Sequence, residues 1–135
     1  MSAAALDEII ENLSLFENWE ERYRYIIDMG DRLPPMDDAL KTDDKLVPGC
    51  TSRVWLDAHI RDGTVHFSVD SDSKIVKGLL YILHQTYNNM SINEIPLLDI
   101  QSAFTRMGLN EHLSPNRRNG FFAVAGQIRS IATKT

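Results

Sequence analysis

The chain has 135 residues, of which 43% are hydrophobic and 24% are charged, and this composition is typical of a globular domain that can bury a core. Its formal net charge is -5 at pH 7, from 14 Lys and Arg against 19 Asp and Glu, so the chain lacks the basic surplus of nucleic-acid-binding proteins. No hydrophobic run approaches the roughly 20 residues that cross a bilayer, and the N-terminus has no signal-peptide pattern. We therefore expect a single domain, residues 1–135, in the cytoplasm, with neither nucleic acid nor membrane as a partner.

Hydrophobic residues at helical spacing predict two helices in the N-terminal part of the chain. The first covers about residues 6–13 and the second about residues 17–29. Their repeating hydrophobic residues are Leu6, Ile9, Ile10 and Leu13, then Trp19, Tyr23, Ile26 and Ile27. Gly30 is expected to end the second helix in the left-handed conformation that glycine adopts readily.

A long ordered loop is predicted for residues 31–49. Pro34 and Pro35 oppose helix formation, and the frequent Asp residues favour turns. Loops of this length inside a compact domain are often functional, so the end of this segment is a candidate place for a site.

A β-hairpin is predicted after this loop. Residues 54–61 alternate between hydrophobic and polar side chains, and residues 64–70 alternate again. The Asp-Gly pair between them favours a two-residue turn. His59 and His66 are expected to face each other on the solvent side of this hairpin.

The remainder of the sequence predicts helices. Residues 71–87 predict a helix that is capped by Ser71, Asp72 or Ser73 and carries a hydrophobic stripe at helical spacing. A capping-box pattern at residues 91–94 predicts a short helix, and residues 101–107 predict another. Ser-Pro at residues 114–115 is a typical start for the last helix. The predicted fold class is therefore α+β, with a small antiparallel sheet of about three strands packed against helices. The third strand could come from the segment just before Cys50.

The one cysteine, Cys50, follows a Pro-Gly turn and precedes the first predicted strand. A free cysteine is often a small buried hydrophobic residue, which is one interpretation. Pro48 and Gly49 favour the other, because turns lie at surfaces and glycine lets another molecule approach the neighbouring sulfur. The local residues leave the structural and the reactive interpretations open.

Two kinds of site receive little support from the sequence. A structural metal site needs about four Cys or His ligands, whereas this chain offers one Cys and four His without paired spacing, so no metal site is predicted. A cysteine hydrolase needs a base near the thiol, and His66 or His112 would have to supply it. No protease-type signature surrounds Cys50, so a hydrolase is the weakest hypothesis.

Basic residues occur in the segment HLSPNRRNG, residues 112–120. Its simplest interpretation is a capped helix start with solvated arginines. Arg117 and Arg118 lie in the first helical turn, where cations oppose the helix dipole. That cost suggests a use for the positive potential, such as holding a thiolate, a persulfide or an acidic partner surface.

Four sequence blocks together resemble the SufE family of sulfur-acceptor proteins. They are WEERYRYII with the following LP, then LVPGCTSRVWL, DSDSKIVKGLL and MGLNEHLSPNRRNG. The blocks span the chain from about Trp19 to Gly120. The pairing of the cysteine block with the HLSP-x-R-x-x-G block is the most specific feature.

The resemblance implies a fold related to iron–sulfur scaffold proteins and a sulfur-carrying role for Cys50. Such proteins take persulfide sulfur from a pyridoxal-phosphate-dependent cysteine desulfurase and pass it to an iron–sulfur scaffold complex or another sulfur acceptor. They need no cofactor of their own. The acidic position of the family pattern falls on Asp72 and its basic position on Arg117, and Ser114, Pro115 and Gly120 also match it. We expect the partner-binding or site-supporting residues to be Gly49, Thr51, Ser52, Asp72, His112 and Arg117. Where this chain has Arg118, the family pattern often has a small polar residue, so the patch here is more basic.

The chemistry of sulfur transfer fits a chain with one cysteine. A thiolate attacks the outer sulfur of a persulfide and a second thiolate leaves, which requires no metal and no second cysteine on the acceptor. An alternative hypothesis keeps Cys50 structural and makes the chain a non-covalent allosteric activator of the desulfurase.

Overall fold

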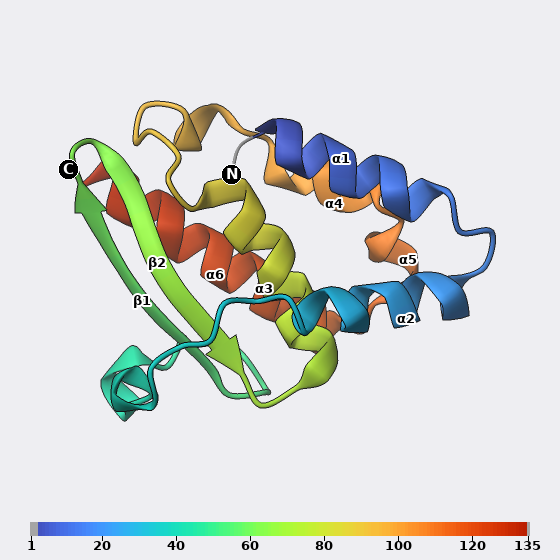
Figure 1. The fold of residues 1–135 in the computed structure, drawn as a ribbon, viewed down its shortest axis with the longest axis horizontal. Coiled ribbons are helices and arrows are strands. Elements are labelled where there is room, and N and C mark those ends of the chain that lie inside the picture. Colours follow the sequence, from blue (N-terminus) through green and yellow to red (C-terminus); the bar gives the residue numbers. More distant parts are fainter. Residues whose placement is uncertain (1–2, 135) are drawn as a thin grey trace.

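The computed structural model describes residues 3–134, which form helices around one β-hairpin (Figure 1). The helices are α1 (Ala3–Ser14), α2 (Trp19–Gly30), α3 (Lys74–Tyr87), α4 (Ile100–Arg106), α5 (Leu109–His112) and α6 (Pro115–Thr133). The strands are β1 (Val54–Arg61) and β2 (Thr64–Ser71), and short 3-10 turns are η1 (Asp38–Leu40), η2 (Asp43–Lys45) and η3 (Ile95–Leu97). The hairpin lies at one side of the molecule, with α3 and α6 between it and the remaining helices. The predicted α+β class is confirmed.

The hairpin forms where the sequence predicts it. Asp62 and Gly63 form its turn with φ angles of 54° and 76°, and this left-handed backbone matches the twist of the two strands. His59 lies opposite His66, and their rings stack with centroids 5.8 Å apart. The expected His pair on the solvent side is therefore present.

The prediction of about three strands is wrong in number, because the sheet has two within the described chain. The segment before Cys50 contributes an isolated bridge between Leu46 and Trp55, and the Val47 N–H donates to the carbonyl of Val54 at 2.8 Å. Gly49, with φ 86°, then leaves the extended conformation and turns the chain away from β1. The segment therefore contacts the sheet without forming a strand.

The prediction of a left-handed cap at Gly30 is also wrong. Gly30 is the last residue of α2, and the capping residue Asp31 has a right-handed helical backbone. The reason for glycine is packing against α3: a Cβ atom at position 30 would lie 2.8 Å from the Gly78 nitrogen, and one at Gly78 would lie 2.0 Å from the Ile26 carbonyl oxygen. The two glycines let α2 and α3 cross closely.

The loop over residues 31–49 is ordered and includes η1 and η2. Two ion pairs hold it to the hairpin. Lys41 Nζ lies 2.7 Å from Asp70 Oδ2, and Lys45 Nζ lies 2.8 Å from Asp57 Oδ1. These contacts fix the path of the chain that leads to the cysteine.

The C-terminal elements follow the prediction closely. The capping-box residues 91–94 form a turn, and the 3-10 turn η3 follows them where a short α-helix is predicted, since Pro96 limits the hydrogen bonding of this segment. Gly108, with φ 77°, separates α4 from α5. Ser114 caps α6, and its Oγ accepts a hydrogen bond from the Arg117 N–H at 3.4 Å.

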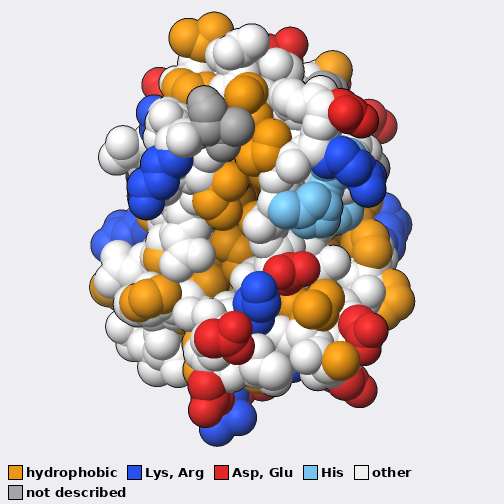
Figure 2. Space-filling view, turned by 90° about the vertical axis from the view of Figure 1, so that its left-hand side faces the viewer, with side chains coloured by type: hydrophobic (Ala, Val, Ile, Leu, Met, Phe, Trp, Pro, Cys, Tyr) orange, Lys and Arg blue, Asp and Glu red, His pale blue; other side chains and the backbone are white. Residues whose placement is uncertain are grey.

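The buried core lies between the hairpin and the helices and includes Phe67 of β2, Leu80 of α3 and Phe121 of α6. Figure 2 looks onto the hairpin side of the molecule and shows a stripe of hydrophobic side chains exposed down the middle of that face. Across residues 3–134, none of the helices has the combined length and hydrophobicity of a membrane span.

Candidate functional site

Cys50 lies in a short loop whose two ends are fastened to each other. The Val47–Val54 hydrogen bond closes the loop at its base. Gly49 adopts φ 86°, a left-handed conformation that side chains other than glycine rarely take, and so delivers the chain to Cys50. The predicted turn is therefore the element that positions the thiol.

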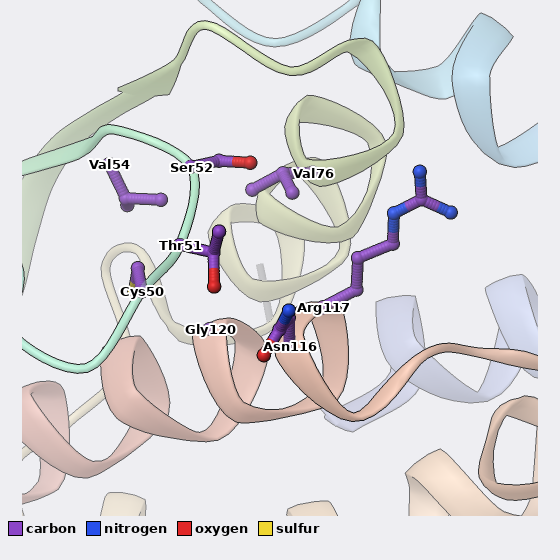
Figure 3. Close-up of a pocket in the computed structure, with 8 residues that line it drawn as sticks. All are labelled: Cys50, Thr51, Ser52, Val54, Val76, Asn116, Arg117 and Gly120. Carbon is purple, nitrogen blue, oxygen red and sulfur yellow. The ribbon is translucent and has the colours of Figure 1, made fainter.

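The Cys50 side chain borders a small pocket between this loop, α3 and the first turns of α6 (Figure 3). The lining residues are Cys50, Thr51, Ser52, Val54, Val76, Asn116, Arg117 and Gly120. The volume of about 20 Å³ is close to that needed by one water molecule. The pocket therefore has room for about one small group beside the sulfur.

Gly120 gives the pocket its space on the α6 side. A Cβ atom at position 120 would lie 3.6 Å from Cys50 Sγ. Gly120 and Asn116 are four residues apart in α6, so they lie on the same face of the helix. Val54 and Val76 are both buried and make the inner wall apolar.

The resting site does not stabilise a thiolate. Cys50 is partly buried, and this burial raises the pKa of its thiol above the ordinary value. Desolvation disfavours the charged form, and the thiol is therefore mainly protonated at neutral pH. Activation of the sulfur requires a change in its surroundings.

Arg117 contributes its side chain to the pocket lining, but its guanidinium is turned away from Cys50 (Figure 3). Its Nη1 donates a hydrogen bond to Tyr23 Oη at 2.9 Å, and the guanidinium carbon lies 5.7 Å from the centre of the Tyr23 ring. Within residues 3–134, no carboxylate pairs with this arginine. The positive charge of Arg117 is therefore not neutralised by a carboxylate among these residues.

Asp72 fastens the other end of the cysteine loop. Its Oδ1 accepts a hydrogen bond from the Arg53 N–H at 3.1 Å, and its own N–H donates to the Arg53 carbonyl at 3.3 Å. The carboxylate side chain is otherwise exposed, just before α3. The structure places Asp72 as a support of the loop.

His112 is not part of the pocket. It is exposed at the end of α5, where its ring stacks on Trp19 with centroids 4.7 Å apart and an interplanar angle of 18°. In the described part of the chain, no histidine lines the Cys50 pocket. The base that a cysteine hydrolase needs is therefore not supplied by these residues.

The structure adds site residues that sequence reasoning missed. Asn116 and Val76 line the pocket, Tyr23 holds Arg117, and the Arg53 backbone binds Asp72. Of these residues, only Asn116 could have been found from the sequence. It lies four residues before Gly120 in the helix predicted to start at the Ser-Pro pair, and this spacing places both residues on one face of the helix. Across residues 3–134, no group of three or more His, Cys, Asp and Glu side chains is placed to hold a metal ion.

Comparisons with known proteins agree with one another. A structure search finds the solution structure of a hypothetical protein from Thermus thermophilus at TM-score 0.78, with 18% identity and 99% of this chain and 97% of that chain covered, so the fold is shared. An uncharacterized SufE-like protein of Rhizobium etli is 38% identical over 133 residues, covering 96% of this chain and 90% of the relative. An uncharacterized SufE-like protein of Rhizobium meliloti is 37% identical over 132 residues, covering 95% and 94%.

The family comparison covers nearly the whole chain. Residues 7–132 match the model of SufE, described as an Fe-S metabolism associated domain. The match includes the Cys50 loop, Asp72 and the α6 segment that closes the pocket. With this match and relatives at 37% and 38% identity, the chain belongs to the SufE family.

Proposed function

We propose that the chain is a sulfur acceptor that takes a persulfide sulfur onto Cys50 from a pyridoxal-phosphate-dependent cysteine desulfurase. The observation that carries this proposal is the pocket beside the thiol, which is apolar on its inner wall and has the volume of about one small group. The SufE match associates the chain with Fe-S metabolism. A receiver for the sulfur, an iron–sulfur scaffold complex or another acceptor, completes the role.

The proposed transfer needs only the cysteine and its partner. The Cys50 thiolate attacks the outer sulfur of the donor persulfide, forming a new S–S bond. The bond between the two donor sulfurs breaks, and its electron pair leaves with the donor thiolate. Atoms and electrons balance without an oxidant or reductant, and Cys50 carries the outer sulfur together with its proton.

The resting geometry suits protection of the carried sulfur. A persulfide is attacked by free thiols, and a second sulfur that enters the pocket lies against Gly120 and the buried valines instead of water. The same burial raises the pKa of the Cys50 thiol, so the free protein holds little thiolate at neutral pH until a partner changes the site. Carriage by one free thiol suits the reducing cytoplasm.

Two of the supporting residues have separate proposed roles. Asp72 keeps the cysteine loop closed through the Arg53 backbone. Arg117 offers an unpaired guanidinium beside the pocket, where exchange of its Tyr23 contact for a thiolate or an acidic partner group would aid transfer. Gly49, Thr51 and Ser52 shape the loop that the partner meets. We propose that residues 1–135 act as one unit in this role.

The test measures alanine formation by the matched desulfurase with L-cysteine and no added reductant. Wild-type chain is expected to accelerate turnover, and Cys50→Ser is expected to abolish the acceleration while still binding. Thr105→Ser, an equally small change at an exposed position of α4 outside the pocket, is the matched control and should behave as wild type. Equal acceleration by Cys50→Ser would support the non-covalent activator hypothesis instead.

A further inference from the structure

A second cavity, of about 130 Å³, is lined by residues of α1, α2 and α3 and shares no residue with the Cys50 pocket. α1 and α2 each pack against α3 (Figure 1). One water molecule needs roughly 10–15 Å³, whereas sites for drug-sized ligands measure roughly 300–1,000 Å³. The cavity between the three helices therefore has room for a small metabolite.

Helical spacing brings polar side chains from two of these helices to the cavity. Glu8 and Asn12 are four residues apart in α1, and Tyr81 and Gln85 are four residues apart in α3. Residues at this spacing lie on one face of a helix. Each helix therefore presents two adjacent polar side chains to the same space.

Arg32 reaches the cavity from the turn that ends α2. Its N–H donates to the Met29 carbonyl at 3.0 Å, and the next residue, Leu33, is buried in the core. Met29 and Ile9 also line the cavity and are themselves buried. The arginine therefore extends from a backbone that is held in place, beside an apolar wall.

The polar side chains around this cavity do not bond to one another. Within residues 3–134, none of the six has a side-chain hydrogen bond or an ion pair. They are Glu8, Asn12, Tyr25, Arg32, Tyr81 and Gln85. The Tyr25 ring is held against Phe16, with centroids 5.0 Å apart, and this contact does not occupy its hydroxyl. A ligand would therefore meet donors and acceptors that the described fold leaves unused.

Opposite charges at one small cavity select a ligand that carries both. The Glu8 carboxylate can accept hydrogen bonds from an ammonium group, and the Arg32 guanidinium can donate to a carboxylate. A ligand with a single charge would complement one of these groups and face a like charge at the other. The amides of Asn12 and Gln85 add further donors and acceptors. The arrangement therefore suits a zwitterion.

We propose that this cavity binds a free α-amino acid with a small side chain. Its carboxylate pairs with Arg32, its ammonium group pairs with Glu8, and its side chain lies against the wall formed by Ile9 and Met29. The proposal goes beyond sulfur acceptance and does not rest on it. Because the two sites share no residue, loss of amino-acid binding and loss of sulfur transfer are separable outcomes.

The first experiment is a titration of the full, reduced chain with L-alanine at pH 7, followed by amide chemical shifts in NMR. Concentrations from about 0.1 to about 20 mM cover the range expected for so small a ligand. Saturable shifts are expected at residues 5–12, 29–32 and 81–85, and none at residues 47–54 around the thiol. Propionate lacks the ammonium group and ethylamine lacks the carboxylate, so each should bind about tenfold more weakly or worse.

Neutral variants test the two charged contacts separately. Glu8→Gln and Arg32→Gln should each weaken L-alanine binding by about tenfold or more. The matched controls are Glu11→Gln in α1 and Arg24→Gln in α2, which remove the same charges at exposed positions outside the cavity and should bind as wild type. All four positions are exposed, so the urea unfolding midpoints should stay close to that of the wild type.

Three results would overturn the proposal. One is the absence of saturable shifts up to about 20 mM L-alanine, where a ligand held by two charged contacts should bind. Another is binding of propionate or ethylamine as tightly as L-alanine, because a single charge would then suffice. The third is wild-type affinity in both folded cavity variants, which would place the bound amino acid elsewhere on the chain.

Discussion

The substitution Gly120→Ala adds one methyl group beside the Cys50 thiol. The new Cβ atom would lie 3.6 Å from Sγ, an ordinary van der Waals distance, so the reduced protein accommodates it. Since residue 120 lies inside α6, replacement of glycine by alanine is expected to raise the free energy of unfolding by about 0.5–1 kcal/mol. The reduced variant should therefore be folded and somewhat more stable than the wild type.

The persulfide form responds differently. Its outer sulfur lies about 2.0 Å beyond Sγ, and the pocket that would receive it has a volume of only about 20 Å³. Overpacking a filled site costs about 1–3 kcal/mol. That free energy corresponds to an about 5- to 150-fold smaller population of the pocketed persulfide in Gly120→Ala.

The assay loads Cys50 with sulfur, removes the desulfurase, adds dithiothreitol and follows the persulfide by intact mass spectrometry. Gly120→Ala should lose its sulfur about 5 to 150 times faster than wild type, as the population change predicts. Gly126→Ala is the matched control, because Gly126 is also in α6, is exposed and has no atom near a built Cβ. Equal decay in Gly120→Ala and Gly126→Ala would refute the idea that the pocket protects the sulfur.

Three further predictions concern packing and protonation. Gly78→Ala should lower the free energy of unfolding, measured in urea, by about 1–3 kcal/mol, because its Cβ would lie 2.0 Å from the Ile26 carbonyl oxygen. Unchanged stability would contradict the close crossing of α2 and α3. Burial lowers the pKa of His84, so the unfolded chain takes up the proton first and stability should fall as pH drops below about 6.5. Urea titrations at several pH values should show that the free energy of unfolding depends less steeply on pH in His84→Phe than in the wild type. An identical pH dependence would argue against His84 as its cause. Alkylation of Cys50 by iodoacetamide should have its pH midpoint above the about 8.5 of an ordinary cysteine, since burial raises the pKa of this thiol; a midpoint at or below that value would mean that the resting site holds a thiolate.

Local sequence patterns were sufficient for the elements that position the thiol. The Pro-Gly turn before Cys50, the Asp-Gly turn of the hairpin and the Ser-Pro start of α6 each depend on neighbouring residues only. The sequence resemblance also led to the family that the comparisons show. The α+β class follows from these elements because each has a clear hydrophobic period.

Features that depend on distant residues could not be predicted. The direction of Arg117 is set by Tyr23, 94 residues earlier in the chain. The need for glycine at position 30 comes from Gly78, which no local pattern reveals. The prediction of a third strand is wrong for a related reason. Only Leu46 and Val47 pair with the sheet, and so short a segment shows no periodicity that could distinguish a strand from a loop.

Whether Cys50 carries sulfur is measured by intact mass spectrometry of the chain after incubation with a cysteine desulfurase and L-cysteine. We expect one added sulfur atom on the wild-type chain, located at Cys50 by peptide mapping, and none on Cys50→Ser. A wild-type chain that binds and accelerates the desulfurase yet shows no added sulfur would contradict this expectation.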